Sequence, residues 1–277
     1  MRRVSKIFTL ALALALCMGL AACGGQTSSD SDLAYIKGNG KIIIGYTDFA
    51  PMNYVDDSGA FTGFDTEFAQ AVCAKLGVEP DFILINWDTK ETELAAKSID
   101  CIWNGMTINP GRLAEMSISV PYVLNAQVVV VKADSGYSST ADLVGKTVVA
   151  EAGSAGEVQI LGDAEHDVEP DTNLSQTNYV LLTKQTDCLL EVMSGTADAC
   201  VLDWTLAKTM VGAGTDFADL MMIPDLFLGE EEYGIAFRKG SDVTAAVNGY
   251  IAELVADGTL PALAEKYDLS LSPKITG

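Results

Sequence analysis

The sequence is poor in basic residues and in histidine. Its 277 residues include 17 Lys or Arg against 38 Asp or Glu, and a single histidine, His166. The formal net charge of −21 argues against nucleic acid, heparin and anionic headgroups as partners, because a negative surface repels polyanions and lacks the cations that neutralise phosphates. One histidine leaves little for histidine-based acid–base catalysis, and its acidic neighbours predict a solvated loop. A small-molecule ligand is still compatible with this charge, because the charge of a pocket can differ from that of the average surface.

Proline is also scarce, with 8 residues, whereas 49% of the chain is hydrophobic. This composition excludes a disordered or collagen-like chain, because the apolar fraction is sufficient for a packed core. The length suits one large domain or two of ordinary size.

Long apolar runs are confined to the N-terminus. Arg2, Arg3 and Lys6 precede an apolar stretch from Ile7 to Ala22, which predicts a signal peptide over residues 1–22. The stretch is short for a permanent membrane span, which needs about 20 apolar residues.

Cys23 follows Leu20-Ala21-Ala22, and this tetrapeptide resembles the bacterial lipobox. The resemblance implies cleavage before Cys23 and its lipidation, so that the membrane is reached only through a lipid anchor outside the cytoplasm. We interpret residues 23–39 as the lipidated N-terminus and a flexible tether, since the segment from Gly24 onward is rich in Gly, Ser and Thr. The alternative is a plain signal peptide with an accidental cysteine.

The other cysteines show no metal-binding pattern. Cys17 leaves with the signal peptide, and the remaining four have no Cys-x-x-Cys spacing, so we expect no zinc site and no other metal. Each lies in an apolar helix or strand pattern, which favours free buried thiols over disulfides, although export permits both. These four are Cys73, Cys101, Cys188 and Cys200.

From residue 41 onward, β-like runs alternate with helical ones. A βαβαβ pattern over residues 41–103 is followed by a second cycle over residues 127–202, which predicts two α/β lobes, each a mostly parallel sheet flanked by helices. A third stretch, over residues 234–267, is expected to return to the first lobe, so that two crossovers form a hinge. The predicted boundaries are lobe 1 at 40–121, hinge at 122–126, lobe 2 at 127–230, hinge at 231–234 and the return to lobe 1 at 235–277. Within lobe 1, Asp65 is expected to cap a helix that ends at Gly77.

Polar residues follow one predicted strand in each lobe. Asn104 and Gly105 come after the strand Asp100 to Trp103, and Asp203 comes after the strand Ala199 to Leu202. In open α/β sheets, ligands bind beyond the carboxyl ends of strands. Two such lobes facing each other predict a ligand cleft between them.

The segment Gly105 to Arg112 is the most informative. Asn109 is a good N-cap and Pro110 suits the first helical position, so Arg112 lies in the first turn of a short helix. An arginine at the positive end of a helix, with the Thr107 hydroxyl nearby, can bind a carboxylate. A surface arginine beside a turn is the alternative from spacing alone.

An ordered set of motifs over residues 41–267 resembles the bacterial extracellular solute-binding proteins of family 3, the amino-acid receptors of ABC importers. The motifs are Gly63-Phe64-Asp65, Gly105-Met106-Thr107 with Arg112, Ser119-Val120-Pro121-Tyr122, Ala197-Asp198-Ala199 with Asp203, and Tyr233-Gly234-Ile235-Ala236-Phe237. The resemblance implies the two-lobe type II periplasmic-binding-protein fold, a free amino acid as ligand, and an ABC permease with its ATPase as partners. It implies no cofactor and no catalysis, and we expect a monomer.

By this resemblance, Arg112 binds the ligand α-carboxylate, with help from Thr107 and from backbone N–H groups near Ser154. Asp203 and the Gly105 carbonyl would bind the α-ammonium, and Glu151 would face the side-chain subsite, favouring an amide, hydroxyl or cationic side chain. Asp203 could instead cap the following helix, and Glu151 could lie at the rim in water. The candidate ligand-binding residues are Tyr46, Phe49, Trp87, Asn104, Gly105, Thr107, Arg112, Glu151, Gly153, Ser154, Ala155 and Asp203. Tyr46, Phe49 and Trp87 would surround the side chain, although plain core packing also explains them.

Three further sequence features have structural rather than catalytic interpretations. Gly153-Ser154-Ala155-Gly156 lacks the ending of a P-loop, so an amide-rich turn for a carboxylate fits better. The segment Asp56 to Gly59 predicts a hairpin turn, and Gly111 stands where the family commonly has an acidic residue.

An arogenate or prephenate dehydratase on the same fold is the alternative function, with Glu151 as the one candidate acid. A sensor module is a third possible function.

Overall fold

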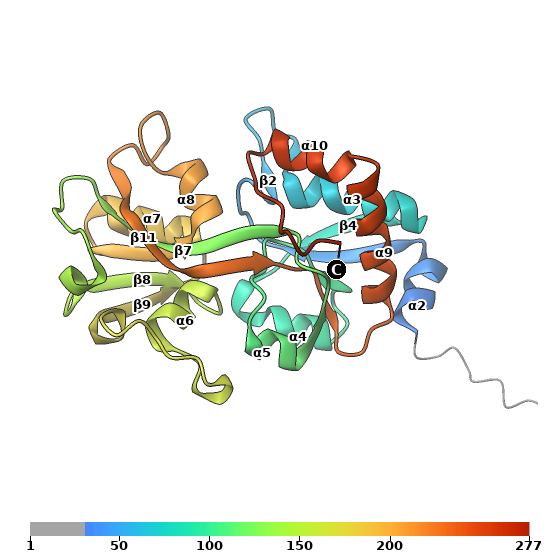
Figure 1. Ribbon diagram of the computed structural model, residues 1–277, viewed down its shortest axis with the longest axis horizontal. Coiled ribbons are helices and arrows are strands. Elements are labelled where there is room, and N and C mark those ends of the chain that lie inside the picture. The colour runs from blue at the N-terminus through green and yellow to red at the C-terminus, as the bar shows by residue number, and fades with distance from the viewer. Residues whose placement is uncertain (1–30, 277) are drawn as a thin grey trace, which may run out of the picture.

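The computed structural model describes residues 31–276 and shows two α/β lobes joined by a pair of long strands (Figure 1). Lobe 1 contains a five-stranded sheet in the order β4-β1-β5-β12-β6. Its strands are β1 (Lys41–Tyr46), β4 (Glu79–Leu84), β5 (Cys101–Ile102), β6 (Met116–Ile118) and β12 (Ala236–Arg238). Its helices are α2 (Asp32–Asn39), α3 (Phe64–Leu76), α4 (Lys90–Ala95), α5 (Pro110–Glu115), α9 (Val243–Ala256) and α10 (Thr259–Lys266).

Lobe 2 contains a second five-stranded sheet in the order β11-β7-β10-β8-β9. Its strands are β7 (Val123–Lys132), β8 (Thr147–Glu151), β9 (Asn178–Leu182), β10 (Ala199–Asp203) and β11 (Leu220–Tyr233). Its α-helices are α6 (Ala155–Leu161), α7 (Gln185–Ser194) and α8 (Trp204–Met210). The segment Thr140–Leu143 forms a short 3₁₀ helix.

The expectation of mostly parallel sheets needs correction, because both sheets are mixed. In lobe 1, β1 pairs in parallel with β4 and β5, but β12 pairs antiparallel with β5 and β6. In lobe 2, β8 pairs in parallel with β9 and β10, but β7 pairs antiparallel with β10 and β11. The strands that run against the others in each sheet are β7 and β12, and each is the first strand after a crossover between the lobes. They enter their sheets directly from the other lobe, without the crossover helix that a parallel connection requires.

The predicted hinge segments 122–126 and 231–234 lie side by side at the junction. Val123 pairs with Tyr233, and Asn125 with Glu231, in the antiparallel ladder of β7 and β11. The length of β11 was not expected from the sequence, because it contains Pro224, which is rare inside strands. Its register shifts between Met222 and Glu230 accommodate the irregularity.

Helix α3 shows how the lobe 1 core forms. Phe64, Phe68 and Val72 lie on its buried face, and Gly77 ends it in the left-handed conformation at φ 78°. The expected cap at Asp65 is wrong, because the N-cap is Gly63 and the Asp65 side chain is fully buried. Asp65 instead serves the site described below.

The interpretation of residues 23–39 as a tether is corrected at its C-terminal end. Residues 32–39 form helix α2, whose Ile36 is buried, and Asp32 accepts a hydrogen bond from Arg238 Nε at 3.0 Å. Ser31 caps this helix by accepting a hydrogen bond from the Ala34 N–H at 2.9 Å, so residues 31–39 belong to the folded lobe. The predicted signal peptide and Cys23 lie outside the described residues. Within residues 31–276, no helix combines the length and apolar character needed to cross a bilayer.

Two smaller expectations are confirmed. Cys73, Cys101, Cys188 and Cys200 are all buried, and each is a free thiol in the structure. Residues 56–59 connect β2 (Tyr54–Val55) and β3 (Phe61–Thr62) as a hairpin turn, in which Asp56 accepts hydrogen bonds from its own loop.

Candidate functional site

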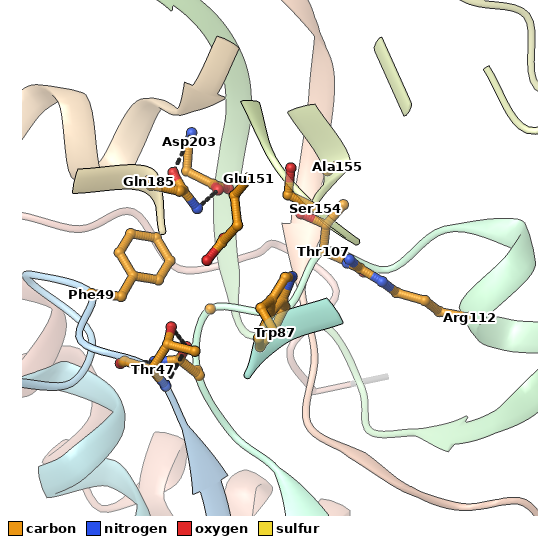
Figure 2. A pocket seen from close by; sticks show the side chains of 12 residues that line it. Thr47, Phe49, Trp87, Thr107, Arg112, Glu151, Ser154, Ala155, Gln185 and Asp203 are labelled. Carbon is orange, nitrogen blue, oxygen red and sulfur yellow. Dashed lines mark hydrogen bonds between the residues drawn. The ribbon is translucent and has the colours of Figure 1, made fainter. Parts of the chain in front are cut away.

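A small cavity lies between the lobes, beyond the carboxyl ends of strands from both sheets (Figure 2). The lining residues are Thr47, Phe49, Trp87, Asn104, Gly105, Thr107, Arg112, Glu151, Ser154, Ala155, Gln185 and Asp203. Ten of the twelve predicted site residues are therefore brought together here, all except Tyr46 and Gly153.

Gly105 forms the floor of the cavity on the lobe 1 side. Its φ is 54°, and a Cβ at this position would lie 2.7 Å from the Phe49 ring, so only glycine fits. Its N–H donates to Asp65 Oδ2 at 2.6 Å, and the Tyr122 hydroxyl donates to the same oxygen at 2.9 Å. Burial raises the pKa of Asp65 to about 7. Asp65 thus holds the backbone turn that carries Gly105.

Arg112 is positioned by the local sequence as expected. Asn109 caps α5 by accepting from the Arg112 N–H at 2.8 Å, and Pro110 is the first helical residue. Arg112 is 7% exposed, and its guanidinium donates from Nη1 to the Thr107 carbonyl at 2.7 Å and from Nη2 to the Gly153 carbonyl at 3.0 Å. Burial lowers the pKa of Arg112. The structure therefore places the buried guanidinium of Arg112 where the two lobes meet.

Two aromatic rings flank the cavity, Phe49 and Trp87, and both are buried. Figure 2 shows them on either side of the space into which Glu151 points. Thr47 and Asn104 form the adjoining wall, with the Thr47 hydroxyl donating to Asn104 Oδ1 at 2.6 Å. The site thus offers an aromatic ring on each side and a hydroxyl–amide pair between them and the lobe 1 sheet.

Asp203 provides the negative charge from lobe 2. It ends β10 and occupies the N-cap position of α8, as the alternative interpretation expected, but its side chain makes no capping hydrogen bond. Its carboxylate accepts hydrogen bonds from Gln185 Nε2 at 2.6 Å, Asn125 Nδ2 at 2.6 Å and the Tyr233 hydroxyl at 2.8 Å. Burial raises its pKa. These donors hold both carboxylate oxygens of Asp203 in place at the cavity wall.

Glu151 lies at the end of β8 and is 4% exposed, so it is not a rim residue in water. Its carboxylate points into the cavity (Figure 2). Burial, and after it the negative charge of Asp203, raises the pKa of Glu151 to about 8. Lys90 and Arg112 act in the opposite direction, but within residues 31–276 neither forms an ion pair with Glu151.

A further acid, Glu231, was missed by the sequence reasoning. It lies in β11 at the junction of the lobes, where Asn125 and Gln127 each bridge its carboxylate to that of Asp203. The Thr107 hydroxyl of lobe 1 donates to Glu231 Oε2 at 3.0 Å. Burial and the neighbouring Asp203 raise the pKa of Glu231 to about 7. Its acidic neighbours along the chain gave no signal that this one residue is buried.

Tyr46 does not face the cavity. Its ring packs against Phe61 and Phe82, with centroids 4.8 and 6.1 Å away, whereas the next residue, Thr47, lines the site. Successive side chains of a strand point to opposite faces, so the aromatic residue lies one position away from the residue that reaches the cavity. Gln185, the other lining residue that was not predicted, begins α7 just beyond the carboxyl end of β9, where the strand-end rule would have found it.

The turn at residues 153–156 was predicted to offer backbone N–H groups. Ser154 caps α6 by accepting from the Glu157 N–H at 3.1 Å, and Ser154 and Ala155 line the cavity. Gly153 lies outside it, and its N–H donates to the Glu157 carboxylate at 2.6 Å. The Gly153 N–H is thus already used within lobe 2, whereas its carbonyl accepts from lobe 1.

Gly111 and His166 meet across the lobes, which corrects the expectation of a solvated histidine. A Cβ at Gly111 would lie 2.9 Å from Asp163 Oδ2 and 3.2 Å from His166 Nδ1, and the His166 side chain is 23% exposed. An acidic residue at position 111 would therefore face Asp163, so glycine avoids a like-charge contact at this point.

A fixed cation from one lobe and carboxylates from the other, around one interlobe cavity, define a two-lobed binding protein for a small zwitterion. Residues 42–270 match the bacterial extracellular solute-binding proteins, family 3. The chain belongs to this family.

Known members are similar over almost their entire length. The chain is 28% identical over 265 residues to the arginine-binding extracellular protein ArtP of Bacillus subtilis, covering 95% of this chain and 98% of that protein. It is 32% identical to the L-cystine-binding protein TcyJ of Escherichia coli, covering 92% of each. A crystal structure of a mutant of ArgBP from T. maritima is 34% identical, with a TM-score of 0.76, and is matched over 86% of this chain and 99% of that one.

Proposed function

We propose that the protein is the extracellular amino-acid-binding component of an ABC importer. Membership of the family and the similarity to arginine- and cystine-binding proteins support this function. The observation that carries it is the arrangement of Arg112 and Asp203, which come from opposite lobes and line one cavity. A zwitterion with buried ends needs one fixed cation and one fixed anion, because a buried unpaired charge is very costly.

In this proposal, Arg112 binds the α-carboxylate and Asp203 binds the α-ammonium. The Thr107 hydroxyl already donates to Glu231, so it would reach the carboxylate only by changing partners. The ligand would contact both lobes and therefore stabilise their closed arrangement, so that binding is coupled to a hinge motion between the lobes.

We propose an amino acid with a cationic side chain as the ligand. Once Arg112 and Asp203 have paired with the two ends of the zwitterion, Glu151 remains as a buried carboxylate that points into the cavity. A cationic side chain would convert it from a costly buried acid into one partner of a charge-assisted hydrogen bond. The rings of Phe49 and Trp87 would add cation–π attraction for a flat guanidinium or an ammonium.

A thermal-shift screen against the twenty amino acids tests both steps. A ligand at 100 times its Kd adds about 2.7 kcal/mol to the free energy of unfolding, so arginine or lysine should raise the melting temperature clearly, while aspartate and glutamate should not. Stabilisation by no amino acid would contradict the function. Stabilisation by acidic amino acids alone would contradict the ligand class.

The remaining expectations also belong to this proposal. A permease with its ATPase would receive the ligand, the protein would act as a monomer without catalysis, and lipid-modified Cys23 would anchor it. If Cys23→Ser partitions with membranes as firmly as the wild type, the lipid anchor is wrong. Product formation from prephenate by the purified protein would instead favour the dehydratase alternative, in which Glu151 would be the acid.

A further inference from the structure

The side chain of Lys90 is buried between the lobes, outside the ligand cavity. Lys90 begins α4 of lobe 1 and is 2% exposed. Its Nζ donates to the Trp87 carbonyl at 3.1 Å and to the Gly153 carbonyl at 2.9 Å, and forms an ion pair with Glu91 at 2.9 Å. Lys90 does not line the cavity. A buried ammonium is costly unless its hydrogen bonds are satisfied, so these contacts explain how the position is tolerated.

One of the three partners belongs to the other lobe. Gly153 follows β8 in lobe 2, and its carbonyl accepts from Arg112 Nη2 at 3.0 Å as well as from Lys90. Two lobe 1 cations therefore converge on a single lobe 2 carbonyl. If the lobes separate, Lys90 loses this acceptor while its contacts with Trp87 and Glu91, which are local to lobe 1, can persist.

Gly153 is also a point of close backbone approach between the lobes. Its φ is 71°, and a Cβ at this position would lie 3.1 Å from Asp88 Cα and 3.2 Å from Lys90 Nζ. A side chain here would hold the lobes apart. Lys90 of lobe 1 and Gly153 of lobe 2 thus form one interlobe contact. Lysine provides the donor, and glycine allows the two backbones to approach closely.

We propose that Lys90 is an interlobe latch, a positioning residue that stabilises the closed arrangement of the lobes and holds Trp87 without touching the ligand. This role rests on the proposed function in one respect, namely that closure of the two lobes retains a bound ligand. The latch acts only in the closed arrangement, which the ligand-free protein also populates in part, so it should slow ligand release and leave ligand entry almost unchanged. Because it does not touch the ligand, it should affect different ligands by the same factor.

The first test is Lys90→Met, which keeps the length of the side chain and removes the ammonium. A hydrogen bond to a charged group contributes about 1.5–3 kcal/mol, so the dissociation rate constant in stopped-flow measurements should rise roughly 10- to 100-fold, with the association rate constant changed less than about threefold. Two ligands found in the amino-acid screen, or arginine at two ionic strengths if only one binds, should show the same factor. Folding should hold, because a well-packed apolar side chain replaces a buried charge.

Lys239→Met is the matched control. Lys239 Nζ also donates to a backbone carbonyl, that of Leu113, at 2.6 Å, but both residues belong to lobe 1. This variant should leave both rate constants unchanged. Gly153→Ala disrupts the same contact from lobe 2 and should also speed dissociation, and its combination with Lys90→Met should give less than the product of the two factors.

Small-angle scattering without ligand separates the latch from the proposed function. We expect Lys90→Met to have a larger radius of gyration than the wild type and Lys239→Met. If an amino acid binds the wild type and Lys90→Met dissociates at the wild-type rate, the latch is wrong and the function stands. If no amino acid binds the wild type, the function is wrong, and the scattering decides the latch: equal radii for all three proteins would overturn it.

Discussion

The two lobes contribute opposite chemistry to one cavity. Lobe 1 supplies the guanidinium of Arg112 and the rings of Phe49 and Trp87, whereas lobe 2 supplies the carboxylates of Glu151 and Asp203. Neither lobe alone can pair both ends of a zwitterion. In the proposed binding mode, the binding energy is therefore realised only when the lobes meet, and a ligand shifts the equilibrium between open and closed arrangements by the contacts it gains in the closed one.

The largest effect should come from removing one charge from each lobe. Arg112→Met and Asp203→Asn should each weaken amino-acid binding more than a hundredfold, since a closed cleft would bury an unpaired ligand charge at a cost of about 3–5 kcal/mol. The two losses should add incompletely, because either change alone prevents closure around the ligand. Calorimetric titration of both variants and the double variant measures this. Near-wild-type affinity in either single variant would refute the zwitterion clamp.

A smaller and selective effect is expected within lobe 2. Glu151→Gln should weaken a cationic amino acid roughly 10- to 100-fold, because that ligand loses a charge-assisted hydrogen bond of about 1.5–3 kcal/mol. A neutral amino acid that binds the wild type should lose far less. Paired titrations with the two ligands check the ratio, and equal losses would mean that Glu151 does not recognise the charge of the side chain.

The stability of the ligand-free protein should fall as the pH rises from about 5 to 8. Burial raises the pKa of Glu151 to about 8 and that of Asp65 to about 7, so in this range the native state binds protons that the unfolded state has released. The free energy of unfolding then decreases with pH, by at most about 1.4 kcal/mol per pH unit for each group.

Urea unfolding at pH 5.5 and pH 8 measures this slope. Glu151→Gln should reduce it through lobe 2 and Asp65→Asn through lobe 1, while Glu231, whose pKa is raised to about 7, should leave a remaining slope in both variants. A flat or rising stability over this range in the wild type would contradict the raised pKa values.

The smallest effect is expected at Tyr46. Its ring contacts Phe61 and Phe82 rather than the cavity, so Tyr46→Leu should change amino-acid affinity less than about twofold while lowering the melting temperature. Phe49→Leu is the matched comparison and should weaken a cationic ligand by about threefold to thirtyfold through lost cation–π attraction. If the two variants lose affinity equally, the assignment of rings to the cavity is wrong.

Much of this arrangement could be predicted from the sequence where local patterns control it. The cap at Asn109 and Pro110 places Arg112, and polar residues after buried strands give Asn104, Gly105 and Asp203. What could not be predicted depends on partners distant in the chain. Nothing in the sequence near Glu231 shows that it meets Asp203, because Asn125 and Gln127 bring the two together through pairing of β7 with both β10 and β11.

The direction of some strands and the orientation of one side chain also differ from what the sequence predicts. The alternating pattern predicts parallel strands but does not show that β12 arrives from the other lobe and enters its sheet antiparallel. The choice of Tyr46 over Thr47 followed residue type, whereas the face of a strand is decided by a shift of a single position.

The pairing of β12 between β5 and β6 has a consequence for the order in which the protein folds. Ala236 pairs with both Ile102 and Ile118, so the sheet of lobe 1 stays divided until the chain beyond lobe 2 has emerged. Lobe 2 is continuous, and its two ends are neighbours, because Ala126 pairs with Glu230. Domains fold as units, and contacts between distant segments form slowly. Lobe 2, although it comes later in the chain, is therefore expected to complete its fold first, and lobe 1 to close around the returning strand.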